Sequence, residues 1–461
     1  MSERPGEISR RAFVQIAAGG LAACALPRGG APGIEPAHPR PSPSQLAWQR
    51  DELAMFLHFG MNTFTDREWG DGRESPATFA PAALDARQWA RAARTAGFRA
   101  LVLTAKHHDG FCLWPTKTTT HSVASSPWRD GRGDVVREFS DACRVEGLKT
   151  GLYLSPWDRN NPAYGDSPRY NDLYVEQLTE LLTRYGPIAE VWFDGANGEG
   201  PNGKKQMYDW PRVWGTVRRL QPNAVIFSDA GPDVRWCGNE RGMAGDPNWS
   251  TVDPSIVTYP GASGPGVIDA LQHGDPHGSV WRPAEVDVSI RPGWFYHPAE
   301  DSRARSADNL LDLYFTSVGR NGKLLLNVPP SRDGLLHDSD VRALSAFSDR
   351  RAVFAHDLAA DARRRWRATS ATTAVLEIDL GRTIEINVAR LAEDIARGQR
   401  VARYTLDGAN DSSWKPIARG TTIGYAKLER FEPASVRRVR LAIEDSVAAP
   451  EPVGVELYTG K

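Results

Sequence analysis

From about residue 47 onward, short apolar runs alternate with amphipathic patterns, and this alternation constrains the fold more than any other feature. The spacing predicts strands at 52–60, 98–106, 148–154, 188–194, 223–228, 284–290 and 323–328. Helices are expected at 82–96, 134–145, 172–185, 210–220, 305–317 and 338–350. Repeated strand-then-helix units imply a parallel sheet, and this many favour a closed barrel over an open sheet. We therefore predict an α/β fold, a (β/α)8-like (TIM-type) barrel, over residues 47–355.

Two regions depart from this pattern. Residues 228–283 are rich in Gly and Pro and show little periodicity, so we expect long rim loops there, and one barrel strand remains unassigned. From residue 356, the segments 373–380, 388–392, 401–406 and 439–443 alternate apolar and polar residues without long helices between them. That pattern predicts an antiparallel β-sandwich over residues 356–461. Trp414 and Tyr425 are among its few loop aromatics, which favours a structural role over carbohydrate binding.

The N-terminal segment has the pattern of an export signal. Ser9-Arg-Arg-Ala-Phe-Val14 and the small apolar residues up to Leu26 predict a twin-arginine signal over residues 1–26. Leu21-Ala-Ala-Cys24 resembles a lipobox, so either Cys24 becomes lipidated or ordinary cleavage occurs nearby. Residues 27–46, rich in Pro, Gly and Ser, are expected to form a linker. We expect a periplasmic, cell-surface or secreted protein, whose only membrane contact would be the lipid at Cys24 if that residue is lipidated.

Charge and cysteine content exclude several classes of partner. The chain has 56 basic and 57 acidic residues and a net charge of -1, which does not favour nucleic acid or an anionic membrane. The four Cys residues match no zinc spacing, and we expect no disulfide framework. No metal ion or other cofactor is expected.

Polar side chains recur where the predicted strands end. In a parallel barrel the carboxyl ends of all strands meet at one rim, where active sites are built from several strands. The apolar run 188–193 places Asp194 at its end and breaks at once into Gly195. The other strand ends carry His58, His107, His108, Tyr153, Asp229, Glu285 and Asn327. One such residue could be a helix cap or a turn residue, but seven strand ends with this property favour a single site.

Two carboxyl groups at such a rim suggest glycoside hydrolysis, which uses one as acid and the other as nucleophile or base. Asp194 is the better nucleophile, because it follows a rigid strand and neighbouring donors can keep it ionised. The acid needs a raised pKa and therefore a partly apolar setting. Glu240, beside Trp236 and Cys237 on a rim loop, satisfies this, and Glu285 is the competing choice.

His58, His107 and His108 could bind a metal ion or donate to sugar hydroxyl groups. Adjacent residues on a strand point to opposite sides, so His107 and His108 should not both reach one ion. No other cluster of metal-binding residues supports a metal site, so we favour the hydroxyl contacts.

At these residues the chain resembles the retaining α-L-fucosidases of glycoside hydrolase family 29. The matching segments run in the same order over about residues 47–355. They are Phe56-Leu-His-Phe-Gly-Met-Asn-Thr-Phe64, Glu68-Trp69, Ala105-Lys-His-His-Asp-Gly-Phe111, Val191-Trp-Phe-Asp-Gly195, Gly238-Asn-Glu240, Arg291-Pro-Gly-Trp-Phe-Tyr-His297 and Asn321-Gly-Lys-Leu-Leu-Leu-Asn327. The C-terminal region is similar to the discoidin-type (galactose-binding-like) domain of the subgroup that prefers α-1,3/1,4-linked fucose.

The resemblance implies an exo-acting α-L-fucosidase that removes terminal fucose through a covalent fucosyl-enzyme intermediate. Asp194 matches the family nucleophile, and Glu240 matches the acid/base of the branched-linkage subgroup, with Glu285 as the alternative. The fucose pocket is expected to be lined by His58, Glu68, Trp69, His107, His108, Tyr153, Trp192 and Trp294. The substrate would be a fucosylated oligosaccharide or glycoconjugate. Two rival hypotheses are a catalytically inactive glycan-binding protein and a related barrel glycosidase acting on another sugar.

Overall fold

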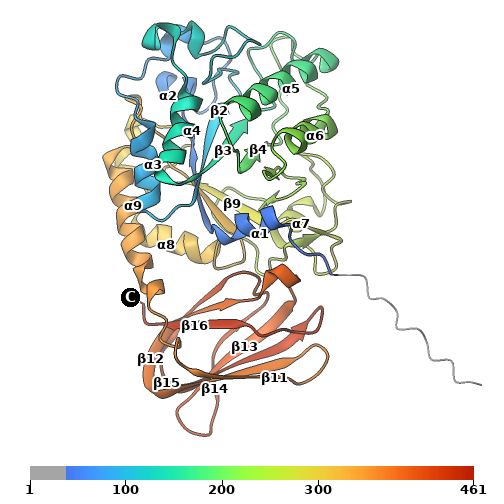
Figure 1. The fold of residues 1–461 in the computed structure, drawn as a ribbon, viewed down its shortest axis with the longest axis vertical. Helices are drawn as coiled ribbons and strands as arrows, with labels where there is room; N and C mark the ends of the chain where they lie inside the picture. The colour runs from blue at the N-terminus through green and yellow to red at the C-terminus, as the bar shows by residue number, and fades with distance from the viewer. Residues whose placement is uncertain (1–37, 461) are drawn as a thin grey trace, which may run out of the picture. The chain divides into compact units, whose positions relative to one another are not determined.

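The computed structural model describes residues 38–460 and contains a parallel barrel followed by antiparallel strands (Figure 1). The predicted export signal, the lipobox at Cys24 and most of the predicted linker lie outside the described residues. The linker prediction is wrong at its C-terminal end, because helix α1 (Pro43–Arg50) begins within it. Ser42 and Gln45 form a capping box that starts this helix. No helix in residues 38–460 is long and apolar enough to cross a membrane.

Eight parallel strands form the barrel and confirm the predicted fold class. In sheet order they are β5 (Val225–Phe227), β4 (Glu190–Trp192), β3 (Lys149–Leu154), β2 (Ala100–Lys106), β1 (Leu53–Leu57), β10 (Lys323–Asn327), β9 (Ala284–Ser289) and β6 (Arg235–Trp236). A single parallel bridge between Phe227 and Val234 joins the two edges of this sheet. The strand that sequence periodicity did not assign is therefore β6, which has two residues and lies in the Gly- and Pro-rich region.

The helices pack around these strands (Figure 1). They are α2 (Met61–Thr65), α3 (Ala86–Thr95), α4 (Val135–Glu146), α5 (Ser167–Arg184), α6 (Trp210–Leu220), α7 (Val267–His273), α8 (Ala307–Thr316) and α9 (Asp338–Arg351). Asp85, Asp134, Asp209 and Ser306 each accept a backbone hydrogen bond as N-cap, and each precedes an amphipathic helix. Strands covered in this way are buried on both faces, which explains their continuous apolar runs. The Gly- and Pro-rich region also holds a short two-stranded sheet, β7 (Thr251–Val252) with β8 (Val280–Trp281).

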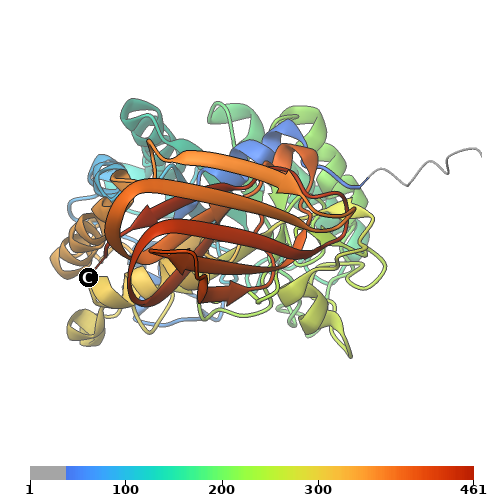
Figure 2. The same cartoon turned by 90° about the horizontal axis from the view of Figure 1, so that it is seen from below.

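The C-terminal residues form the predicted antiparallel sandwich (Figure 2). Its strands are β11 (Arg363–Ala368), β12 (Ala374–Ala392), β13 (Val401–Ala409), β14 (Lys415–Gly420), β15 (Lys427–Ser446) and β16 (Gly454–Tyr458). Two segments predicted as separate strands, 373–380 and 388–392, belong to the single long strand β12. Its pairing with β15 shifts register between Asp379 and Ile384, so β11 pairs with its first half and β16 with its second. Both halves contribute to one apolar core.

Polar contacts join the sandwich to the barrel. Asn321, in a left-handed conformation at φ 61°, donates to Gln399 and accepts from the backbone N–H of Tyr425. Arg390 of β12 forms an ion pair with Glu52, which precedes β1. Tyr425 is buried and donates to the Gly322 carbonyl at 2.7 Å. This aromatic side chain therefore serves the junction between the two domains.

Candidate active site

A cavity of about 260 Å³ opens at the carboxyl ends of the barrel strands. It is lined by Phe56, His58, Glu68, Trp69, His107, His108, Tyr153, Trp192, Asp194, Glu240, Asp287 and Trp294. Ten of these twelve were predicted as site residues from the sequence, and Phe56 and Asp287 were not. Of the residues predicted at the strand ends, Asp229, Glu285 and Asn327 do not line the cavity. A larger cavity, of about 640 Å³, lies at the amino ends of the strands and contains none of the predicted residues.

Asp194 lies at the end of β4 and takes part in three close contacts. Tyr153 donates its O–H to Oδ2 at 2.7 Å, the backbone N–H of Ala196 donates to Oδ1 at 3.3 Å, and His108 Nε2 lies 3.6 Å from Oδ2. Burial raises the pKa of Asp194 to about 6, although the Tyr153 and Ala196 hydrogen bonds act in the opposite direction. The carboxylate is therefore mostly ionised at neutral pH. A Cβ on the following Gly195 would lie 2.3 Å from the backbone nitrogen of Gly261, which explains the glycine.

His58 is a buried, neutral imidazole whose tautomer is fixed by Asn327. Asn327 Nδ2 donates to the Trp294 carbonyl at 2.8 Å, so its Oδ1 must face His58. This Oδ1 accepts from the His58 backbone N–H and lies 2.8 Å from Nδ1, which therefore carries the proton. Burial lowers the pKa of His58 to about 3. Its Nε2 is consequently unprotonated and can accept a hydrogen bond.

His107 and His108 both line the cavity, which corrects the expectation that they point to opposite sides. The reason is that β2 ends at Lys106, so strand alternation does not apply to the two residues that follow it. Their ring centroids lie 4.0 Å apart. Ser155 donates to the Trp157 carbonyl and so accepts from His108 Nδ1 at 2.8 Å. Burial lowers the pKa of His108 to about 3, which leaves its Nε2 as an acceptor beside Asp194.

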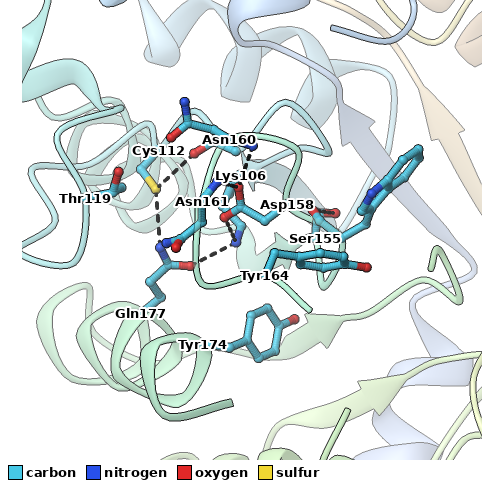
Figure 3. A network of polar contacts seen from close by, with 12 residues as sticks. Lys106, Cys112, Thr119, Ser155, Asp158, Asn160, Asn161, Tyr164, Tyr174 and Gln177 are labelled. Carbon is cyan, nitrogen blue, oxygen red and sulfur yellow. Dashed lines mark hydrogen bonds and ion pairs between the residues drawn. The ribbon is translucent and has the colours of Figure 1, made fainter. Parts of the chain in front are cut away.

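A buried ion pair links the loop after β2, which carries these histidines, to the loop after β3; Lys106 and Asp158 are labelled in Figure 3. Lys106 Nζ lies 3.1 Å from Asp158 Oδ2 and donates to Gln177 Oε1 at 2.9 Å. Asp158 Oδ1 accepts from the backbone N–H groups of Asn160 and Asn161. Lys106 directly precedes His107, and Asp158 belongs to the loop after β3. The pair therefore couples the ends of β2 and β3 to helix α5.

Glu68 is held by the loop that follows β9. The backbone N–H groups of Trp294 and Phe295 donate to its two carboxylate oxygens at 2.9 and 3.0 Å, and His297 Nε2 lies 2.7 Å from Oε1. Trp69, the next residue, is 62% exposed at the mouth of the cavity. Its ring contacts His108 edge-on at a centroid distance of 6.1 Å.

The two acid/base candidates occupy different environments. Glu240 lies in the loop after β6, and its Oε2 accepts from Trp294 Nε1 at 3.3 Å at the wall of the cavity. Glu285, on β9, is fully buried in the barrel interior and accepts from Trp192 Nε1 at 3.2 Å. Burial raises the pKa of Glu285 well above its usual value, and the nearby Glu190 adds to this shift. Glu285 therefore supports the floor of the cavity from beneath, and Glu240 faces into it.

Sequence reasoning missed Asp287, a cavity residue on β9. Trp236 Nε1 donates to its Oδ1 at 2.9 Å. The run from Glu285 to Ser289 alternates polar and apolar residues, which places Asp287 on the same side of the strand as Glu285. That alternation was the signal that could have identified it.

A family model, known protein sequences and solved structures all match this chain to the same family. The alpha-L-fucosidase family model matches residues 48–349. Alpha-L-fucosidase 1 of Arabidopsis thaliana is 42% identical over 457 residues, which cover 92% of this chain and 88% of that protein. A glycoside hydrolase 29 family member from a rumen bacterium is 40% identical with a TM-score of 0.85, and the match covers 93% of this chain and 78% of that one. A Ruminococcus gnavus GH29 fucosidase in complex with fucose is 30% identical with a TM-score of 0.83, over 93% and 96% of the two chains.

Proposed function

This chain belongs to the glycoside hydrolase family 29 alpha-L-fucosidases, and on that premise we propose that it removes terminal α-linked L-fucose with retention of configuration. Asp194 would be the nucleophile and Glu240 the acid/base. The observation that carries the proposal is that Asp194, Glu240 and the predicted pocket residues line one cavity. Its substrates would be fucosylated oligosaccharides or glycoconjugates.

In the first step, the Asp194 carboxylate attacks the anomeric carbon while the bond from that carbon to the leaving oxygen breaks. Glu240 gives its proton to the leaving oxygen, and a fucosyl ester forms on Asp194. In the second step, Glu240 takes a proton from a water molecule whose oxygen attacks the anomeric carbon. The ester bond breaks, Asp194 regains its charge, and fucose leaves with its original configuration. The raised pKa of Asp194, about 6, is compatible with an ionised nucleophile at neutral pH.

The lining of the cavity suits a 6-deoxy sugar. The unprotonated Nε2 atoms of His58 and His108 can accept hydrogen bonds from sugar hydroxyl groups, as can the Glu68 carboxylate. Phe56 and Trp294 provide apolar surface against which the C5 methyl group could pack. A pocket of about 260 Å³ favours a single terminal sugar and hence exo action.

The Asp194→Ala variant tests the nucleophile. We expect it to lose turnover of an aryl α-L-fucoside, and azide should restore the reaction and give the inverted β-fucosyl azide. Loss of activity without azide rescue would contradict the assignment. If the wild-type enzyme hydrolysed no α-fucoside but cleaved another glycoside, the rival hypothesis of a related barrel glycosidase acting on another sugar would replace the fucosidase proposal.

A comparison of Glu240→Ala with Glu285→Ala tests the acid/base. The acid/base variant should lose most rate on substrates with poor leaving groups and little on activated aryl fucosides, because only poor leaving groups need the proton. Glu285→Ala should instead impair both substrate types alike, since Glu285 holds Trp192 from beneath the floor. A wild-type response of Glu240→Ala on both substrates would move the role to Glu285.

For linkage we propose α-1,3/1,4-linked fucose on branched glycans, since Glu240 matches the acid/base position of that subgroup. The exposed Trp69 at the mouth offers an aromatic face to the sugars beyond fucose. Rates on α-1,2-, α-1,3-, α-1,4- and α-1,6-linked fucosyl oligosaccharides would decide this. A preference for α-1,2 or α-1,6 would refute it.

We also propose export by the twin-arginine route. Changing Arg10 and Arg11 to Lys should retain the protein in the cytoplasm, as judged by cell fractionation. Metabolic labelling with a fatty acid, compared between wild type and Cys24→Ala, would show whether Cys24 carries a lipid.

A further inference from the structure

We propose that Asp287 is a substrate-binding residue of this cavity, and that its neutral carboxyl group donates a hydrogen bond from Oδ2 to a hydroxyl oxygen of the bound sugar. The proposal rests on the proposed function in one respect, because it takes the cavity to hold the fucosyl unit. No proton or bond is transferred in this role.

The geometry gives Asp287 one anchored oxygen and one free one. Its side chain is 5% exposed and lines the cavity. Oδ1 accepts from Trp236 Nε1 at 2.9 Å, which fixes the plane of the carboxyl group. Among residues 38–460, no group donates a hydrogen bond to Oδ2. Oδ2 is not among the fully buried atoms without a partner, so it is open to the cavity, where a hydroxyl group of a ligand can reach it.

The surroundings of Asp287 favour its neutral form. Burial raises the pKa of Asp287 to about 8, and the carboxylates of Glu240 and Asp229 add to the shift, while the Trp236 hydrogen bond opposes it. Cys237 and Glu285 also lie nearby, and burial keeps both neutral by raising their pKa. Asp287 therefore keeps its proton below about pH 8 and loses it above.

The other polar groups of the cavity are mainly acceptors. His58 and His108 present unprotonated Nε2 atoms, and Asp194 and Glu68 are carboxylates. The Tyr153 O–H and the indole N–H groups of Trp192 and Trp294 already donate hydrogen bonds, to Asp194, Glu285 and Glu240 respectively.

In the described part of the cavity wall, Trp69 and His107 hold the other side-chain N–H groups without a protein partner. Each sugar hydroxyl group donates once and also accepts, so a site of this composition lacks donors. The proton of Asp287 supplies one.

Competitive inhibition by L-fucose between pH 7 and 9.5, above the pKa of about 6 of Asp194, tests the proposal, because binding of the product needs no proton transfer. In the wild type, fucose binding should weaken above about pH 8. In Asp287→Asn, whose amide donates but does not titrate, binding should stay level over this range. Trp236→Phe removes a hydrogen bond that favours the charged form, so the weakening should shift to higher pH.

Asp287→Ala should bind fucose about 10- to 100-fold more weakly at every pH below 8, as expected for a lost hydrogen bond in a desolvated site. Thermal unfolding would verify that Asp287→Ala is folded. If this variant does not fold, the comparison of the wild type with Asp287→Asn tests the proposal by itself. Identical pH dependence of wild type and Asp287→Asn, or wild-type binding by a folded Asp287→Ala, would overturn the proposal.

The same assay separates this proposal from the proposed function. A wild-type enzyme that hydrolyses α-L-fucosides and shows none of the Asp287 effects refutes only the role of Asp287. A wild-type enzyme that neither binds fucose nor cleaves any α-L-fucoside refutes the proposed function itself.

Discussion

The buried ion pair between Lys106 and Asp158 gives the sharpest stability prediction. The two side chains are 0% and 2% exposed, so neither charge is screened by solvent. Lys106→Met would leave Asp158 Oδ2 without a partner and orphan Oε1 of Gln177, whereas Tyr170 would still donate to the Pro156 carbonyl. Removing one member of a buried pair costs about 3–5 kcal/mol. We therefore expect the free energy of unfolding to fall by about 4 kcal/mol, a large share of the stability of an ordinary domain.

Urea unfolding followed by tryptophan fluorescence and circular dichroism would measure this loss. The matched control is Arg132→Met, which breaks an ion pair whose side chains are 81% and 85% exposed and should cost less than about 1 kcal/mol. The double variant Lys106→Met/Asp158→Asn should be more stable than the sum of the single losses predicts, because no buried charge remains. A loss below about 1 kcal/mol for Lys106→Met, or strict additivity in the double variant, would refute the reasoning.

Three further predictions concern the nucleophile, the pocket and the domain junction. Tyr153→Phe removes the O–H donor to Asp194, so the pKa of Asp194 should rise above about 6. The acid side of the plot of kcat/KM against pH should then move to higher pH, and an unmoved plot would contradict this. Glu68→Gln cannot accept from both backbone N–H groups of the loop after β9, so kcat/KM on an aryl fucoside should fall roughly tenfold. Arg390→Met breaks the ion pair with Glu52 and should lower the thermal unfolding midpoint while leaving the activity of the folded enzyme unchanged.

Much of the barrel could be predicted because periodicity and burial are linked. Each predicted strand of the barrel corresponds to an observed one, since strands buried on both faces are mostly apolar. Strand β9 is buried throughout but alternates polar and apolar residues. Strand β6 was not predicted, because a strand of two residues is too short to show a repeating pattern of apolar residues. Its place is set by its partner, since Trp236 pairs with Glu285 and Val234 bridges to Phe227. Such long-range pairing leaves no local signal in the sequence.

In the sandwich, sequence reasoning found strands and misjudged their continuity. The segments 373–380 and 388–392 are parts of β12, and the exposed Gly381, Arg382 and Thr383 interrupt the pattern between them, where the register shifts. A polar interruption reads as a loop from sequence, but backbone pairing continues on both sides of the register shift. Hydrophobic alternation reports burial and only indirectly reports strand boundaries.

The choice between Glu285 and Asp287 shows what strand-end reasoning cannot resolve. Both point to the same side of β9, and two residues of a strand advance by about 7 Å. That advance places Glu285 beneath the Trp192 indole and Asp287 in the cavity wall beside the Glu240 loop. The sequence identifies the face of the strand but not the depth in the barrel, because depth depends on where the large side chain at the floor lies. Trp192 sets that level, since its ring stacks on Phe227 at a centroid distance of 4.3 Å and its N–H reaches down to Glu285. The carboxyl group below this ring supports the floor, and the one above it is available to the substrate.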